Sequence, residues 1–288
     1  MKTLVEQSYA KINIALNIKG IREDGYHDLD MVMLPLKLHD SLRFAELPKK
    51  KDDFVIMDDF TFYIGDNNIA HKAIDLLNER YNLNGKKFKI IIHKNIPMQA
   101  GMGGGSSNAA ATLRGIDRFC KLNIPHDELL DMCKLLGSDV PFFLDSKPAR
   151  CQGVGEILSP VKVKNDYSVI IVKPEDGCST KKAYAEFDKT PTFNSVDVDK
   201  VIKALEEGDD ELLANSIGNA LQETSIHLVP EIKDIIDELK AKGLKIVMMT
   251  GSGSVVFGMS TDKKLVKKIW KELDEDERYQ VELTEVIK

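Results

Sequence analysis

The sequence predicts a two-domain α/β protein. The chain has 288 residues, enough for two domains of about 100–200 residues each. Its first 46 residues read mainly as strands separated by turns. From about Tyr167 onward, strand patterns alternate with helical patterns, which is typical of a sheet covered by crossing helices. We therefore divide the chain near residue 160, into domains 1–160 and 161–288.

The N-terminal domain begins with strands. Apolar and polar residues alternate over residues 11–18, and a polar break follows at 20–27. Residues 31–36 and 41–44 then favour two further strands. The opening of the chain is therefore mostly β.

A helix and a strand follow this β-rich opening. Apolar side chains recur at helical spacing over 69–77, after Asn67 and Asn68, which are suitable N-cap residues. Gly85 ends the connection, and residues 88–92 favour a strand. The segment after this strand therefore connects a strand to a helix.

A second helix is expected over 126–136, where four apolar residues fall on one face and Gly137 provides the stop.

The C-terminal domain is expected to contain alternating strands and helices. In order, these are strand 168–172, helical stretches within 197–223, helix 230–241, strand 245–249, strand 255–259, helix 263–273 and strand 280–286.

Composition excludes several classes of function. Hydrophobic residues make up 43% and charged residues 30%, and 40 basic against 46 acidic side chains give a net charge of −6, which argues against nucleic-acid binding. No apolar run approaches the ~20 residues of a membrane helix. The four cysteines form no pair at metal-binding spacing, and the N-terminus has no apolar leader. We expect a cytoplasmic protein, a monomer or weak homodimer, without nucleic-acid or membrane partners.

The most informative segment is the glycine loop at residues 97–111. Four glycines, at 101, 103, 104 and 105, are followed by two serines and a run of alanines that favours a helix. Free N–H groups at the start of a helix can converge on an anion. The segment therefore predicts a phosphate-binding loop.

Two familiar phosphate loops do not fit this segment. The P-loop requires a lysine after its last glycine, but Ser106 follows Gly105. The dinucleotide fingerprint requires a third glycine where this chain has Ser106, counted from Gly101, or Asn108, counted from Gly103. A flexible loop without function would account for one or two glycines, but four conformationally costly ones argue against it.

The glycine loop resembles the ATP-binding loop of the superfamily of galactokinase, homoserine kinase, mevalonate kinase and phosphomevalonate kinase. Residues 10–13 and 250–254 stand where that superfamily has its other two motifs. Within it, four segments resemble the family of 4-diphosphocytidyl-2-C-methyl-D-erythritol kinases: 11–16, 20–29, 32–40, and 177–180 with Tyr184. The resemblance implies the two-domain small-molecule kinase fold of this superfamily, with an active site between the domains.

The resemblance also implies the reaction, which is ATP-dependent phosphorylation of the 2-hydroxyl of a diphosphocytidyl sugar alcohol in the non-mevalonate isoprenoid pathway. ATP would bind mainly to domain 1–160, and the alcohol would lie between the two domains, with 161–288 as the substrate-binding domain. Mg²⁺ would accompany ATP, and because this ion usually keeps several waters, we name no metal-binding residue. The ATP-binding residues implied are Pro97, Met98, Gln99, Ala100, Gly101, Met102, Gly103, Gly104, Gly105, Ser106 and Ser107.

Two residues carry the catalytic roles that the resemblance implies. Asp139 would be the base that accepts the proton of the substrate hydroxyl, although such a residue could instead cap the next turn. Lys11 shares a strand face with Asn13, and that face could simply meet water. The resemblance places Lys11 beside the catalytic aspartate, where it would favour the carboxylate and steady the transferring phosphoryl group.

Substrate recognition is assigned by the same resemblance. Tyr26 and Tyr184 would enclose the cytosine ring. His27 would read the edge of the ring through its backbone or its side chain, and Asn13 would contact the methylerythritol end. The loop residues that would close over this pocket are Gly251, Ser252 and Gly253. Without the resemblance, Tyr26 and His27 read as turn residues, Tyr184 as a core aromatic and the loop as a plain turn.

Two other functions remain open from the sequence. Another small-molecule kinase of the superfamily would share the glycine loop but lack the turn Gly25-Tyr26-His27. A nucleotide-binding module without catalysis would keep the loop and lose Lys11 or Asp139. All of these residues are present here.

Overall fold

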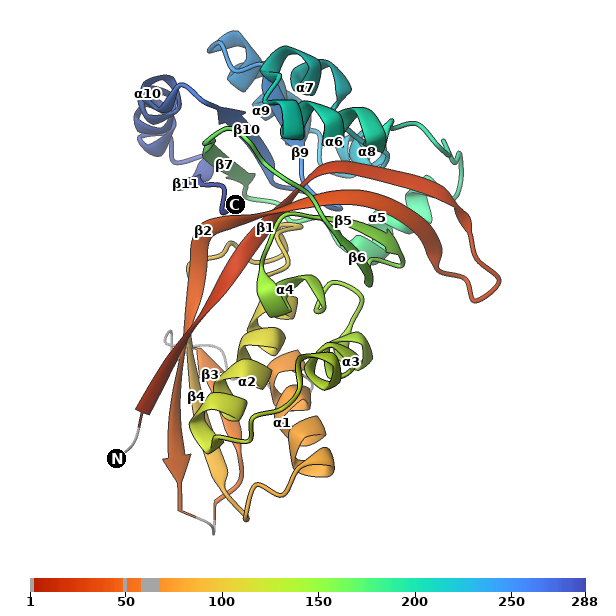
Figure 1. Cartoon of the computed structure of the whole chain (residues 1–288). Helices are drawn as coiled ribbons and strands as arrows, with labels where there is room; N and C mark the ends of the chain where they lie inside the picture. The colour runs from red at the N-terminus through yellow and green to blue at the C-terminus, as the bar shows by residue number, and fades with distance from the viewer. Residues whose placement is uncertain (1–2, 49–50, 58–67) are drawn as a thin grey trace. The chain divides into compact units, whose positions relative to one another are not determined.

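The computed structural model describes residues 3–48, 51–57 and 68–288 (Figure 1). Contacts group the chain into two compact units. Unit 1 contains the described residues of Met1–Ala10, His39–Ile96 and Gly103–Ser146, and unit 2 those of Lys11–Leu38, Pro97–Met102 and Lys147–Lys288.

The two units are interleaved along the chain because the long strands β1 (Thr3–Ile21) and β2 (His27–Leu47) each contribute residues to both. The division inferred from the sequence has a single break, at residue 160. The assignment of ATP binding to 1–160 and of substrate binding to 161–288 remains a prediction.

Unit 1 is a sheet with helices packed beside it. Strand β4 lies parallel to β3 and antiparallel to residues 41–47 of β2. The helices contact one another and lie on one side of β3 and β4 (Figure 1). The elements of unit 1 besides β1 and β2 are β3 (Phe54–Met57), α1 (Ile69–Arg80), β4 (Lys87–His93), α2 (Gly104–Cys120), α3 (His126–Leu136) and α4 (Phe142–Asp145).

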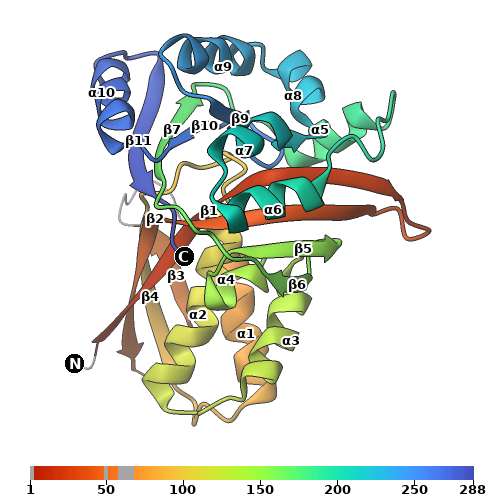
Figure 2. The same cartoon turned by 45° about the horizontal axis from the view of Figure 1, so that its top comes forward.

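Unit 2 contains a sheet in the order β11-β7-β10-β9, in which all neighbours are antiparallel. Helices α9 and α10 pack against it (Figure 2). Strand β5 pairs with β2 and with β6, and β8 runs parallel to β1. The elements are β5 (Ala149–Gly153), β6 (Ile157–Pro160), β7 (Ser168–Pro174), α5 (Thr180–Phe187), α6 (Val198–Glu207), α7 (Asp210–Ser216), β8 (Gly218–Asn219), α8 (Gln222–Leu228), α9 (Glu231–Ala241), β9 (Ile246–Met249), β10 (Val256–Ser260), α10 (Lys263–Asp274) and β11 (Tyr279–Glu285).

Most expected helices and strands are confirmed. Helix α3 has the predicted bounds, and Gly137 is its C-cap. Asn68 is the N-cap of α1, and its side chain accepts a hydrogen bond from Ala70 N at 2.7 Å, whereas Asn67 lies outside the described residues. None of the helices in the described ranges is long and apolar enough to cross a membrane.

The expectation of two separate strands at 31–36 and 41–44 is wrong, because β2 is continuous over His27–Leu47. The polar residues between them do not interrupt the strand. Leu38 N donates to Thr284 Oγ1 at 2.8 Å, and the Asp40 side chain is fully buried and hydrogen-bonded. Polar side chains that find partners are compatible with a strand.

Candidate active site

The N-terminus of α2 lies in unit 1 and is formed by the last three glycines of the glycine loop. Gly103 is its N-cap, with φ of 72° and no side-chain cap. Ser107 N donates to Gly103 O at 2.9 Å, so Ser107 N–H is the first donor within the helix, and the N–H groups of Gly104, Gly105 and Ser106 lie before it. Three backbone donors and the positive end of the helix dipole can therefore serve an anion.

The Ser107 hydroxyl adds a further polar group to this helix terminus. Ser107 is 1% exposed, and its Oγ atom has no hydrogen-bond partner within the described part of the chain. Buried hydroxyls in folded proteins nearly always have a partner. The unpaired hydroxyl one turn into α2 is consistent with a site that a polar ligand completes.

Lys94 brings a positive charge to the same terminus. A Cβ atom added to Gly104 would lie 3.1 Å from Lys94 Nζ, which places the ammonium group beside the first turn of α2. The fully buried carboxylate of Asp40 pairs with Lys94 Nζ and accepts hydrogen bonds from Asn95 N and Ile96 N, both at 2.8 Å. Sequence reasoning gave Asp40 no role, although it lies at the end of the segment 32–40 that resembles the kinase family.

Lys11 and Asn13 lie side by side in unit 2, as the strand spacing predicts. Lys11 Nζ contacts Asn13 Oδ1 and donates to Gly101 O at 2.6 Å, and Lys11 N donates to Met102 O at 3.1 Å. Lys11 is 3% exposed and Asn13 is 1% exposed. The interpretation of this face as a solvated one is therefore wrong, and the lysine is built into the loop that ends at Met102.

The loop after β9 meets the glycine loop backbone to backbone. Gly101 and Gly251 have φ of 68° and 57°, a left-handed conformation that side chains disfavour. A Cβ on Gly101 would lie 2.4 Å from Thr250 O, and a Cβ on Gly251 would lie 2.7 Å from Gly101 O. Only glycine fits at either position, and Thr250 Oγ1 also accepts from Asn13 N at 2.9 Å.

Ser252 is held by side chains from two helices. Its Oγ atom lies 2.9 Å from Thr180 Oγ1, and its carbonyl accepts from Ser225 Oγ at 3.0 Å. The residue is 7% exposed. Ser252 and the neighbouring Gly253 thus belong to a fixed loop rather than to a plain surface turn.

His27 and Tyr184 are brought together, whereas Tyr26 points away from the core of unit 2. The rings of His27 and Tyr184 lie 4.5 Å apart between centroids. Tyr26 is 65% exposed, and its N–H donates to Asp24 Oδ1 at 3.0 Å within the turn before β2. The arrangement of Tyr26 and Tyr184 around a base remains a prediction.

Asp139 lies between α3 and α4 in unit 1 and is partly exposed. Val140 N donates to Gly137 O at 3.1 Å, which forms a turn around it. Helix α4 has Pro141 as its N-cap and no side-chain cap, so Asp139 does not cap α4. Its carboxylate is available for another role.

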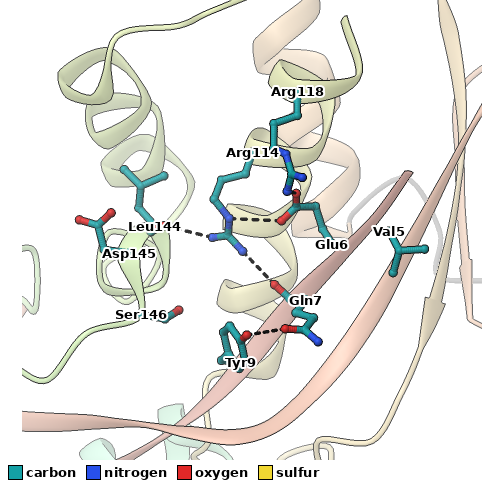
Figure 3. A pocket seen from close by; sticks show the side chains of 9 residues that line it. All are labelled: Val5, Glu6, Gln7, Tyr9, Arg114, Arg118, Leu144, Asp145 and Ser146. Atoms are coloured by element: carbon teal, nitrogen blue, oxygen red, sulfur yellow. Dashed lines mark hydrogen bonds and ion pairs between the residues drawn. The ribbon is translucent and has the colours of Figure 1, made fainter. Parts of the chain in front are cut away.

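Unit 1 also holds a polar pocket of about 420 Å³ that contains none of the predicted site residues (Figure 3). Arg114 donates to Phe143 O at 2.6 Å. It also donates to Gln7 O at 2.9 Å, and Glu6 pairs with both Arg114 and Arg118 (Figure 3). Burial lowers the pKa of Arg114 from its usual value. The guanidinium of Arg114 therefore connects β1, α2 and α4 through protein acceptors.

The chain matches the GHMP kinases in both of their characteristic parts. Residues 68–147 match the N-terminal domain of the GHMP kinases, and residues 201–278 match their C-terminal part. The first range contains α1, the glycine loop, α2 and Asp139, and the second contains the loop at 250–253.

Relatives of nearly the same length share about a third of their residues with the chain. It is 37% identical over 268 residues to the 4-diphosphocytidyl-2-C-methyl-D-erythritol kinase of Bacillus pumilus, covering 93% of this chain and 91% of that protein. It is 36% identical over 252 residues to the protein of the same name in Clostridium tetani, covering 88% and 89%.

Solved structures agree with these relatives. The crystal structure of a 4-(cytidine 5'-diphospho)-2C-methyl-D-erythritol kinase matches with a TM-score of 0.82 and 27% identity, covering 98% of this chain and 99% of that one. Homoserine kinase from Cytophaga hutchinsonii matches with a TM-score of 0.76 at 14% identity, covering 100% and 95%. The second match is a similarity of fold.

Proposed function

The chain belongs to the GHMP kinases and, among them, to the family of 4-diphosphocytidyl-2-C-methyl-D-erythritol kinases, and from this premise we propose its reaction. The protein transfers the γ-phosphoryl group of ATP to the 2-hydroxyl of 4-diphosphocytidyl-2-C-methyl-D-erythritol, a step of the non-mevalonate isoprenoid pathway. The observation that carries this proposal is the 37% identity over 93% of the chain to such a kinase.

The start of α2 supports ATP as the phosphoryl donor. Its three free N–H groups and the adjacent Lys94 ammonium offer hydrogen bonds and positive charge to phosphate oxygens. The unpaired Ser107 hydroxyl can complete the set. We propose that residues 97–107 hold the triphosphate, as the family's loop does.

Mg²⁺ is proposed to enter with ATP. Within the described residues, no group of three or more His, Cys, Asp or Glu side chains could hold a metal ion. Mg²⁺ that accompanies a nucleotide is usually coordinated mainly by substrate phosphates and water. Ser107 Oγ is a protein oxygen that has no hydrogen-bond partner among the described residues and could contact it. When bound, the ion would neutralise charge on the phosphates.

Asp139 and Lys11 are the proposed catalytic residues. The Asp139 carboxylate accepts the proton of the 2-hydroxyl, the oxygen forms its new bond to the γ-phosphorus, and ADP leaves with the electrons of the broken P–O bond. Lys11, whose ammonium is held by Gly101 O and Asn13 Oδ1, offsets negative charge on the transferring phosphoryl group.

The diphosphocytidyl alcohol is proposed to bind through unit 2. The paired rings of His27 and Tyr184 and the exposed ring of Tyr26 supply aromatic surface for the cytosine base. Asn13 and the loop residues Gly251, Ser252 and Gly253 are proposed to contact the methylerythritol end. We place the reaction in the cytoplasm, which is consistent with four free cysteines.

A substrate panel tests the reaction against the other kinases of the superfamily. Purified protein is supplied with ATP, Mg²⁺ and either 4-diphosphocytidyl-2-C-methyl-D-erythritol, homoserine or mevalonate, and ADP release is measured. We expect release with the diphosphocytidyl alcohol alone. Release only with homoserine or mevalonate would refute the proposed substrate, and no release with any alcohol would favour a nucleotide-binding module.

A further inference from the structure

The ring of His27 is fixed from three sides by residues at the end of α5. Its Nε2 atom lies 2.7 Å from Asp188 Oδ1, its face packs on Tyr184 with centroids 4.5 Å apart, and Phe187 meets it edge-on at 6.1 Å. The His27 side chain is 9% exposed. The sequence analysis named His27 and Tyr184 but gave Asp188 no role.

The end of α5 provides a firm support for Asp188. Asp188 is the C-cap of α5, and its N–H donates to Tyr184 O at 2.9 Å. The same turn of backbone therefore positions both the carboxylate and the aromatic ring that contact His27. The Asp188 side chain is 40% exposed, and a carboxylate can only accept hydrogen bonds.

This contact determines which nitrogen of His27 carries the proton. Because an ionised carboxylate has no hydrogen to donate, the 2.7 Å contact requires the hydrogen on Nε2. In the neutral ring, Nδ1 is then an acceptor. Nδ1 makes no hydrogen bond to any residue in the described ranges, so its lone pair is left for a ligand.

We propose that Asp188 is a positioning residue that holds the Nε2-protonated form of His27, so that Nδ1 accepts a hydrogen bond from the exocyclic amino group of cytosine. The proposal rests on the proposed function, which supplies a cytosine base. Cytosine carries an amino donor where uracil carries a carbonyl acceptor. Holding this tautomer therefore makes the site select cytidine over uridine substrates.

Variants at two aspartates, one in contact with the His27 ring and one adjacent to His27 only in sequence, test this role. Asp188→Ala removes the oxygen that accepts from His27 Nε2. Asp188→Asn keeps a side-chain oxygen at the same distance from the backbone, and Asp28→Ala is the matched control. Asp28 adjoins His27 in sequence, has a similarly exposed side chain and pairs with Lys19 at 3.3 Å. Each variant is assayed with the diphosphocytidyl substrate and with its diphosphouridyl analogue, after its thermal unfolding has confirmed the fold.

We expect Asp188→Ala to raise KM for the cytidine substrate about tenfold, the effect of one hydrogen bond, with kcat within about twofold of wild type. In Asp188→Ala, the ratio of kcat/KM for the cytidine substrate to kcat/KM for the uridine substrate falls by the same factor. Asp188→Asn recovers part of this ratio. Asp28→Ala changes neither KM for the cytidine substrate nor the ratio. An unchanged ratio in Asp188→Ala, or an equal loss with both substrates, overturns the proposal.

Two readouts separate this proposal from the reaction itself. The ¹⁵N shifts of His27 report its tautomer without turnover. Wild type should show the Nε2–H form alone, and Asp188→Ala should show a mixture of the two neutral tautomers. Calorimetric titration with CDP and UDP measures base preference without phosphorylation. A wild-type protein that prefers CDP but does not phosphorylate the alcohol refutes the proposed function alone, whereas an Nδ1–H tautomer or equal affinity for CDP and UDP refutes the role of Asp188.

Discussion

Replacing Gly101 with alanine should separate the glycine loop from the loop that begins at Thr250. The new Cβ would lie 2.4 Å from Thr250 O, inside the 3.0 Å that real Cβ contacts keep. One backbone must therefore move. The carbonyl of Gly101 is the acceptor for Lys11 Nζ at 2.6 Å, so a displacement here also displaces the proposed catalytic lysine.

The magnitude follows from two separate effects. A left-handed alanine costs about 1–2 kcal/mol, which lowers the midpoint of unfolding by a few degrees. Displacing a catalytic group by about 1 Å can lower the rate on the order of 10²-fold. We expect Gly101→Ala to lower kcat by about that factor.

Gly85→Ala isolates the first effect from the second. Gly85 has the same φ of 68°, but a Cβ there meets nothing within 4 Å. The midpoint of thermal unfolding should therefore fall by a similar amount in both variants, and kcat should fall only in Gly101→Ala. The assay is coupled ADP release at saturating ATP and alcohol, alongside thermal unfolding. Equal kcat for the two variants would refute the reasoning.

Three further variants test separate parts of the account. Lys11→Met should lower kcat at least 10²-fold while thermal unfolding still shows a folded protein; full turnover would remove Lys11 from the mechanism. Asp139→Asn should lower kcat by about 10²–10⁴-fold with little change in ATP affinity measured by calorimetry, and wild-type kcat would exclude it as the base. Lys263 and Lys37 lower the pKa of Glu285 from 4.5 to about 2, so this carboxylate stabilises the folded state above about pH 4.5 and loses that effect as the pH falls toward 2. Glu285→Gln should therefore unfold at a lower temperature than wild type at pH 7, with a difference that disappears between pH 4.5 and 2; a constant difference would contradict the assignment.

Local patterns predicted what depends on neighbours in sequence. Helix α3 follows from one apolar stripe and a terminal glycine, and the start of α1 follows from the cap at Asn68. The pairing of Lys11 with Asn13 follows from the two-residue period of a strand. Each of these signals lies within a few residues of the feature that it predicts.

Contacts between distant residues were not accessible in this way. Asp40 stands 54 residues before the lysine it binds, and Asp188 stands 161 residues after His27. The polar residues before Asp40 favoured a break in β2, because the partners that make a buried carboxylate tolerable come from elsewhere in the chain. The glycines at 101 and 251 were visible, but their mutual contact was not.

Identification of the product tests the central claim most directly. Wild-type protein is incubated with ATP, Mg²⁺ and 4-diphosphocytidyl-2-C-methyl-D-erythritol labelled with ¹³C at carbon 2, and ³¹P and ¹³C spectra are recorded. The account predicts one new phosphomonoester signal that couples to carbon 2, with one ADP formed per product. A phosphate on another hydroxyl, or ADP formed without a phosphorylated alcohol, would contradict it.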